Sequence, residues 1–202
     1  MPGQFIVVEG LDRCGKDTQI NLLLQSMPDA IKFNFPNEQL ESGRKCRQYL
    51  LQQIQLTDFE INELYALNRR ETMPEIVKLL NENKTVICSR YAFSGVAYTS
   101  AKGNMTLEEA LQADKGILIP NITLFIYSEP KDIQQRFNGN DRYENVEFQE
   151  KVLNQFRQIK NHRGVGQWKE ILVNKGIEET FKEVKQAIQE CTETGVKYGL
   201  FE

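Results

Sequence analysis

The sequence predicts a single α/β domain built on a five-stranded parallel sheet with helices on both faces. Short apolar runs of good strand formers alternate with longer segments whose apolar residues recur at helical spacing. The length of 202 residues suits one such domain, so we expect residues 1–202 to fold as a unit. Because crossovers between parallel strands are right-handed, loops that follow the strands gather at the carboxyl edge of the sheet. The expected strands are residues 5–8, 31–35, 85–89, 122–127 and 168–173.

The helices are predicted from apolar spacing and from start signals. Ile20, Leu23, Leu24 and Met27 recur at helical spacing after the first strand. The run Thr106-Leu-Glu-Glu resembles a capping box, which starts a helix. A glycine within residues 92–99 weakens that helix, and residues 138–143 are polar and glycine-containing, as in a flexible loop. Further helices are expected at residues 43–53, 58–82, 130–137, 147–160 and 177–191.

Composition excludes several function classes. The net charge of −3 leaves no broad basic field, so nucleic acid is not an expected partner. No apolar run approaches membrane-spanning length, and the first strand begins too early for a targeting peptide, so we expect no membrane association. The four cysteines are far apart and form no C-x-x-C pair, which fits a reducing compartment. We expect a cytoplasmic protein, with the nucleus as the alternative.

Residues 10–18, Gly-Leu-Asp-Arg-Cys-Gly-Lys-Asp-Thr, match the spacing of a P-loop between a strand and a helix. Glycines let successive N–H groups point at phosphate oxygens, and the helix adds its positive N-terminal end. Lys16 can reach the β- and γ-phosphates. The next residue normally has a hydroxyl that binds Mg²⁺, but here it is Asp17. The expected ATP-binding residues are Gly10, Leu11, Asp12, Arg13, Cys14, Gly15, Lys16, Asp17 and Thr18.

Four further segments accompany this loop: residues 34–36 (Asn-Phe-Pro), 66–69 (Ala-Leu-Asn-Arg), 89–98 (Ser-Arg-Tyr-Ala-Phe-Ser-Gly-Val-Ala-Tyr) and 141–144 (Asp-Arg-Tyr-Glu). Together they resemble the thymidylate kinases, notably the eukaryotic and poxviral kind, over nearly the whole chain. The run at 90–98 is the most specific part. The resemblance implies a P-loop kinase fold with a short lid at about 138–144. It also implies transfer of the γ-phosphoryl group of ATP to dTMP, giving dTDP and ADP for dTTP biosynthesis, with Mg²⁺ and a homodimer.

The resemblance assigns the positive charges that such a transfer needs. It implies catalytic roles for Arg13 on the γ-phosphate, Lys16, Arg90 and the lid residue Arg142. Arg69 and Arg90 match arginines that bind the acceptor phosphate. Tyr65 matches a family position whose aromatic ring stacks on thymine. Tyr98 matches an aromatic residue under the deoxyribose, and Asp12 matches a carboxylate that contacts the 3′-hydroxyl. The implied dTMP-binding residues are Asp12, Phe35, Pro36, Tyr65, Arg69, Arg90, Ser94, Gly95, Tyr98 and Tyr143.

Three residues depart from the family pattern. Asp17 replaces the Mg²⁺-binding hydroxyl, Ser89 replaces the aspartate that opens the Asp-Arg-Tyr motif, and Glu38 replaces an arginine that contacts the dTMP phosphate. Our hypothesis is that Asp17 and Ser89 have exchanged places, which preserves one carboxylate and one hydroxyl at the Mg²⁺. Arg44 is a candidate to reach the phosphate in place of the missing arginine, and Glu38 could instead point away.

Two alternatives stay open at this point. Glu38 favours a kinase of the same fold with another nucleoside or nucleoside monophosphate as acceptor. The degeneration of Asp17 and Ser89 would instead leave a nucleotide-binding protein that no longer catalyses. Acceptor-stimulated ATP consumption distinguishes the kinases from the binding protein.

Overall fold

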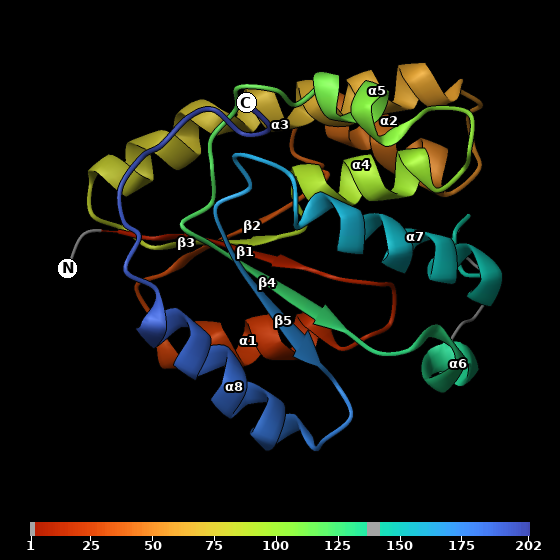
Figure 1. The fold of residues 1–202 in the computed structure, drawn as a ribbon. Coiled ribbons are helices and arrows are strands. Elements are labelled where there is room, and N and C mark those ends of the chain that lie inside the picture. The colour runs from red at the N-terminus through yellow and green to blue at the C-terminus, as the bar shows by residue number, and fades with distance from the viewer. Residues whose placement is uncertain (1–2, 137–141) are drawn as a thin grey trace.

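The computed structural model describes residues 3–136 and 142–202 and confirms the expected α/β fold (Figure 1). Five strands form one parallel sheet in the order β2-β3-β1-β4-β5. Their bounds differ from the expected ones by at most a residue at either end. They are β1 (Phe5–Glu9), β2 (Ile31–Asn34), β3 (Val86–Ser89), β4 (Ile122–Tyr127) and β5 (Gln167–Leu172).

Helices cover both faces of this sheet. Helices α1 and α8 pack together on one face, whereas α2, α3, α4, α5 and α7 lie on the other (Figure 1). The bounds are α1 (Lys16–Ser26), α2 (Glu41–Leu50), α3 (Asp58–Asn81), α4 (Ala92–Ser100), α5 (Leu107–Gln112), α6 (Pro130–Ile133), α7 (Val146–Ile159) and α8 (Ile177–Glu190), with a 3₁₀ turn η1 (Gln134–Arg136) after α6.

One helical expectation is confirmed by the structure and another is corrected. The capping box predicted at Thr106 is present, because Thr106 and Glu109 each bond the other's backbone N–H. The helix expected at 130–137 changes to the 3₁₀ turn η1 after Ile133, and residue 137 lies outside the described residues. Of the lid expected at 138–144, residues 138–141 also lie outside them.

The glycine in α4 allows two helices to approach closely. A Cβ atom at Gly95 would lie 2.9 Å from Nη2 of Arg69 on α3. All nine residues of α4 are buried among α3, α5 and α7, so tertiary packing outweighs the weak helix propensity of glycine. The apolar positions of α4 are therefore used inside the domain.

The register of the sheet aligns the ends of three strands. Ser89 of β3 pairs with Val8 of β1 on one side and with Asn34 of β2 on the other. Residues that follow these strands therefore meet at one edge, as in other parallel sheets. No helix in the described part of the chain is long and apolar enough to cross a bilayer.

Candidate active site

The P-loop connects β1 to α1 at the carboxyl edge, where the sequence analysis places it. Gly10 has a φ of 149°, and a Cβ atom there would lie 1.8 Å from the carbonyl oxygen of Ile126 on β4. Gly15 has a φ of 97° and forms the N-cap of α1. Both positions therefore require glycine, and they shape a turn whose N–H groups can face an anion.

Lys16 lies in the first turn of α1 and is almost fully buried. Its Nζ donates a hydrogen bond to the carbonyl oxygen of Leu11 within the loop. Burial and the nearby Arg90 guanidinium lower the pKa of Lys16 below its usual value. A phosphate at the loop would add the negative charge that favours the protonated amine.

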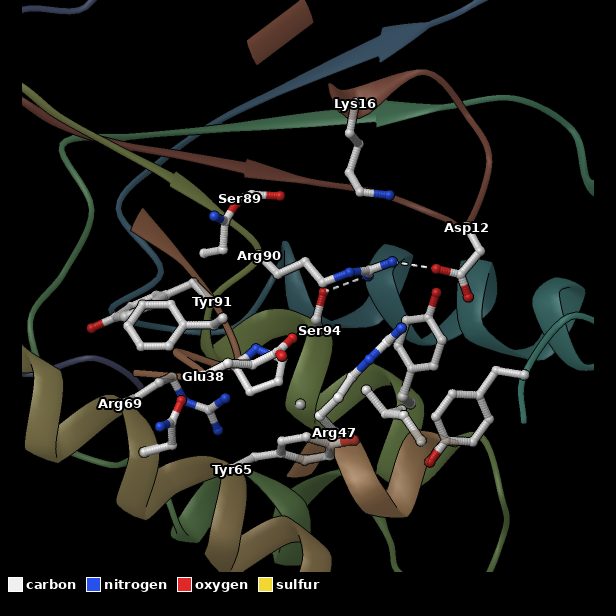
Figure 2. Close-up of a pocket in the computed structure, with 18 of the residues that line it drawn as sticks. Asp12, Lys16, Glu38, Arg47, Tyr65, Arg69, Ser89, Arg90, Tyr91 and Ser94 are labelled. Carbon is white, nitrogen blue, oxygen red and sulfur yellow. Dashed lines mark hydrogen bonds and ion pairs between the residues drawn. The ribbon is translucent and has the colours of Figure 1, made fainter. Parts of the chain in front are cut away.

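A cavity of about 600 Å³ opens between the P-loop, α2, α3 and α4 (Figure 2). It brings together most of the expected site residues, from segments far apart in the chain. Those that line it are Asp12, Arg13, Lys16, Asp17, Phe35, Pro36, Tyr65, Arg69, Ser89, Arg90, Ser94, Gly95, Tyr98 and Tyr143. The expected residues outside its lining are Gly10, Leu11, Cys14, Gly15, Thr18 and Arg142.

Arg90 occupies the middle of this cavity (Figure 2). Its backbone has a φ of 64°, in the left-handed region, and its side chain forms an ion pair with Asp12. The guanidinium also donates to the carbonyl oxygen of Gly10 at 3.3 Å and to Oγ of Ser94 at 3.2 Å. Burial opposes ionisation of Asp12, but Arg90 and Lys16 outweigh it and hold the pKa of this carboxyl below its usual value.

A buried carboxylate that the sequence analysis did not single out holds the residues that follow Arg90 in the chain. Glu9 is fully buried and accepts hydrogen bonds from the N–H groups of Tyr91 at 2.9 Å and Ser94 at 3.0 Å, and from Oγ of Ser94. It thereby fixes the start of α4 to the end of β1. Burial raises the pKa of the Glu9 carboxyl, although these hydrogen bonds and Arg90 act in the opposite direction.

Arg69 is held at the end of the cavity opposite Lys16 (Figure 2). Its Nε and Nη2 donate to the two carboxylate oxygens of Asp114 at 2.7 and 2.5 Å, and both side chains are buried. Burial alone would lower the pKa of Arg69, but Asp114 raises it above its usual value. The sequence analysis missed Asp114 because it lies 45 positions from Arg69 and carries no motif.

The aromatic wall of the cavity depends on a second residue without a sequence signal, Gln149 of α7. Its side chain donates to Asp12 at 2.9 Å and to the carbonyl oxygen of Tyr143 at 3.0 Å, and accepts from Tyr98. The rings of Tyr98 and Tyr143 lie 5.2 Å apart. Gln149 therefore connects the P-loop, α4 and the segment after residue 141.

The lid arginine lies away from the cavity in this structure. The Arg142 guanidinium stacks 4.1 Å over the ring of Tyr49 and donates to the carbonyl oxygen of the same residue at 3.3 Å. Its neighbour Glu144 instead forms an ion pair with Arg13 of the P-loop at 2.8 Å. Arg13 and Glu144 thus make a direct contact between the P-loop and this segment, and the catalytic role of Arg142 stays a prediction.

The three departures from the family pattern all line the cavity. Asp17 lies in the first turn of α1, and Ser89 ends β3. Glu38 also lines the cavity and so does not point away from it. Arg44 does not replace the missing arginine, because its Nη1 donates to the backbone carbonyl oxygens of Gln39 at 2.9 Å and Glu38 at 3.4 Å.

We expect Glu9→Gln to gain stability relative to wild type as the pH rises from about 4.5. Burial raises the pKa of Glu9 above its unfolded value of 4.5, so above that pH the folded protein retains a proton that the unfolded chain has lost. Wild-type stability therefore falls with rising pH until the folded carboxyl is fully ionised, and the glutamine variant avoids this loss. Urea unfolding followed by circular dichroism from pH 4.5 to 8 measures the difference.

Glu63→Gln, at an exposed position of α3, serves as the control for the loss of one surface charge. A difference between Glu9→Gln and wild type that does not change with pH would contradict the interpretation.

Comparison with known proteins agrees with this arrangement. Residues 8–188 match the family model described as thymidylate kinase. The thymidylate kinase of Schizosaccharomyces pombe is 39% identical over 162 residues, which cover 78% of this chain and 77% of the relative. The human thymidylate kinase is 33% identical over 205 residues, covering 99% and 96%. The structure of thymidylate kinase from Candida albicans superposes with a TM-score of 0.86 at 28% identity, covering 98% of both chains. The chain belongs to the thymidylate kinase family, the dTMP kinases.

Proposed function

We propose that ATP and dTMP meet at Arg90, with ATP on the P-loop side of the cavity and dTMP on the side of Tyr65 and Tyr98. The observation that carries this proposal is the position of Arg90 between Lys16 and Arg69, which lie at opposite ends of one cavity (Figure 2). A guanidinium in this position can bind oxygens of both substrates at once, because its fork presents several N–H groups in one plane.

In the reaction, an oxygen of the dTMP phosphate forms a bond to the γ-phosphorus of ATP, and the bond to the β–γ bridging oxygen breaks. ADP leaves with the electron pair, and dTDP is formed. The transfer depends on alignment and on positive charge around the moving oxygens. In our proposal, Lys16, Arg13 and Arg90 supply that charge, and Arg142 joins them when the segment around it closes.

The acceptor nucleoside is proposed to lie against the aromatic residues. Tyr65 stacks on the base, while Tyr98 crowds the position of a 2′-hydroxyl and Asp12 accepts from the 3′-hydroxyl. Phe35 and Pro36 shape the phosphate side. Arg69 follows Tyr65 by one turn of α3, so we place Arg69 beside the base and no longer assign it to the acceptor phosphate.

The residues present fit a Mg²⁺ bound mainly by phosphate oxygens and water. In the described part of the chain, the Asp17 carboxylate and the Ser89 hydroxyl make no hydrogen bond or ion pair with the protein, although both line the cavity. Oxygen ligands of this kind suit Mg²⁺, which usually takes one or two protein ligands at a nucleotide. When bound, Mg²⁺ neutralises charge on the β- and γ-phosphates. Asp17 and Ser89 are the residues that would hold it.

A homodimer is proposed to form through α3. Phe59 and Leu67 are 63% and 47% exposed, two helical turns apart on the outward side of this helix. Large exposed apolar side chains grouped on one helix are typical of an interaction surface.

All four cysteines are buried free thiols, which supports our proposal of a reducing, cytoplasmic location.

We expect ADP production from ATP and Mg²⁺ to be stimulated mainly by dTMP. A coupled assay with dTMP, dUMP, dGMP or no acceptor measures this directly. Stimulation by dUMP or dGMP above that by dTMP would assign the chain another acceptor. An absence of turnover, with ATP binding measured in parallel by calorimetry, would indicate a nucleotide-binding protein.

The exchange of Asp17 and Ser89 predicts compensation between two substitutions. Asp17→Ser leaves two hydroxyls and Ser89→Asp leaves two carboxylates, so each single variant should lose roughly tenfold or more in kcat/KM at limiting Mg²⁺. The double variant restores one group of each kind and should recover most of the activity. Losses that simply add in this double-mutant cycle would refute the exchange.

We expect Leu67→Glu to convert a dimer into a folded monomer, because the carboxylate would be desolvated at the α3 interface. Light scattering coupled to gel filtration measures the mass, and circular dichroism checks the fold. Ile177→Glu, at an exposed apolar position on α8, is the matched control and should remain dimeric. A wild-type chain that is monomeric at micromolar concentration would rule out this proposal.

A further inference from the structure

Among the described residues, five cationic side chains line the cavity, and four of them already bond other groups of the protein. Arg90 pairs with Asp12, Arg69 with Asp114 and Arg13 with Glu144, while Lys16 donates to a loop carbonyl. The fifth is Arg47 of α2, which the sequence analysis did not single out. Within residues 3–136 and 142–202, the Arg47 guanidinium makes no hydrogen bond, ion pair or ring contact.

Arg47 lies on an exposed turn of α2, at the wall of the cavity that faces the P-loop. Figure 2 shows its side chain running from α2 toward the part of the cavity where Arg90 and Asp12 lie, and away from Arg69. Its direction is therefore toward the place where the phosphate groups of the two substrates meet in the proposed reaction, rather than toward the base.

The charge balance of the cavity shows what Arg47 contributes. In the part of the chain that the structure describes, its lining contains five cations and four carboxylates: Arg13, Lys16, Arg47, Arg69 and Arg90 against Asp12, Asp17, Glu38 and Glu144. Without Arg47 the numbers would be equal. Glu38 places one of these negative charges on the acceptor side, where a phosphate would be repelled. A nearby cation that has no carboxylate partner can offset this repulsion.

We infer that Arg47 binds the phosphate of the acceptor nucleotide, together with Arg90, and that it supplies from α2 a positive charge that the loop at Glu38 does not provide. The inference deepens the proposed function and rests on it. A guanidinium suits the role because it can donate two hydrogen bonds to two oxygens of one phosphate. Arg90 is already shared among Asp12, Gly10 and Ser94, so a second arginine adds donors that are not yet used.

The test compares two ligands that differ only in the phosphate. Calorimetry measures the Kd of dTMP and of thymidine for wild type and for Arg47→Ala. A charge-assisted contact to the phosphate predicts that dTMP binds roughly 10- to 100-fold more weakly to the variant. Thymidine, which lacks the phosphate, should bind within about twofold of wild type, since a twofold change is only ~0.4 kcal/mol.

Lys45→Ala is the matched control, because it removes an exposed cation from the same helix at a position outside the cavity. It should leave the Kd of both ligands unchanged. A second variant tests for compensation. It combines Arg47→Ala with Glu38→Arg, which restores a cation on the opposite wall of the acceptor side. This double variant should recover most of the dTMP affinity.

Equal weakening of dTMP and thymidine by Arg47→Ala would overturn the inference, because Arg47 would then act on the nucleoside or on the fold. Unchanged dTMP binding would overturn it as well. So would a result in which Arg47→Ala weakens the binding of ATP and leaves that of dTMP unchanged. Failure of the proposed function is distinguishable, since wild type itself would then show no preference for dTMP over other acceptors in the turnover assay.

Discussion

The site depends on the hydrogen bonds that the buried carboxylate of Glu9 accepts. Glu9 ends β1, immediately before the P-loop, and accepts hydrogen bonds from the first turn of α4. One side chain thereby sets the distance between the start of the P-loop and the start of α4. Arg90 lies between β3 and α4, and its own N–H donates to the carbonyl oxygen of Val8 on β1 at 2.9 Å. The next N–H, of Tyr91, donates to Glu9, so these two bonds to β1 hold the strained left-handed backbone of Arg90.

From this fixed point the remaining groups are arranged by pairing. Arg69 is oriented by Asp114, Asp12 by Arg90 and Gln149, and Arg13 by Glu144. Such pairs keep flexible side chains in one geometry before a substrate arrives, which lowers the entropy that binding has to overcome. They also keep buried charges compensated, since an isolated charge in this environment would be very unfavourable.

The fold was largely predictable from the sequence because its signals are local. Each strand is a short apolar run and most helices have clear spacing or caps, so the elements shifted at their ends, and the helix expected at 130–137 became a 3₁₀ turn after Ile133. The P-loop and the residues 89–98 were likewise recognisable, since their chemistry is contained in contiguous motifs. Asp114 and Gln149 were not, because each bonds residues that only the folded chain brings near. Arg47 was not, because only the folded chain places it in the lining of the cavity. Arg44 shows the same limit: its position suggested a phosphate ligand, but its guanidinium bonds the backbone nearby.

Arg47 and Arg69 differ in how tightly the fold constrains them. Arg69 is buried and paired, so any change there also affects the packing of α3 against α4. Arg47 projects from a solvent-exposed turn, where a substitution leaves no cavity and no orphaned partner among the described residues. Substitutions on the wall formed by α2 consequently cost little stability. If Arg47 binds the acceptor phosphate as we infer, changes of charge on this wall alter recognition of the incoming nucleotide while the stability of the domain stays nearly constant.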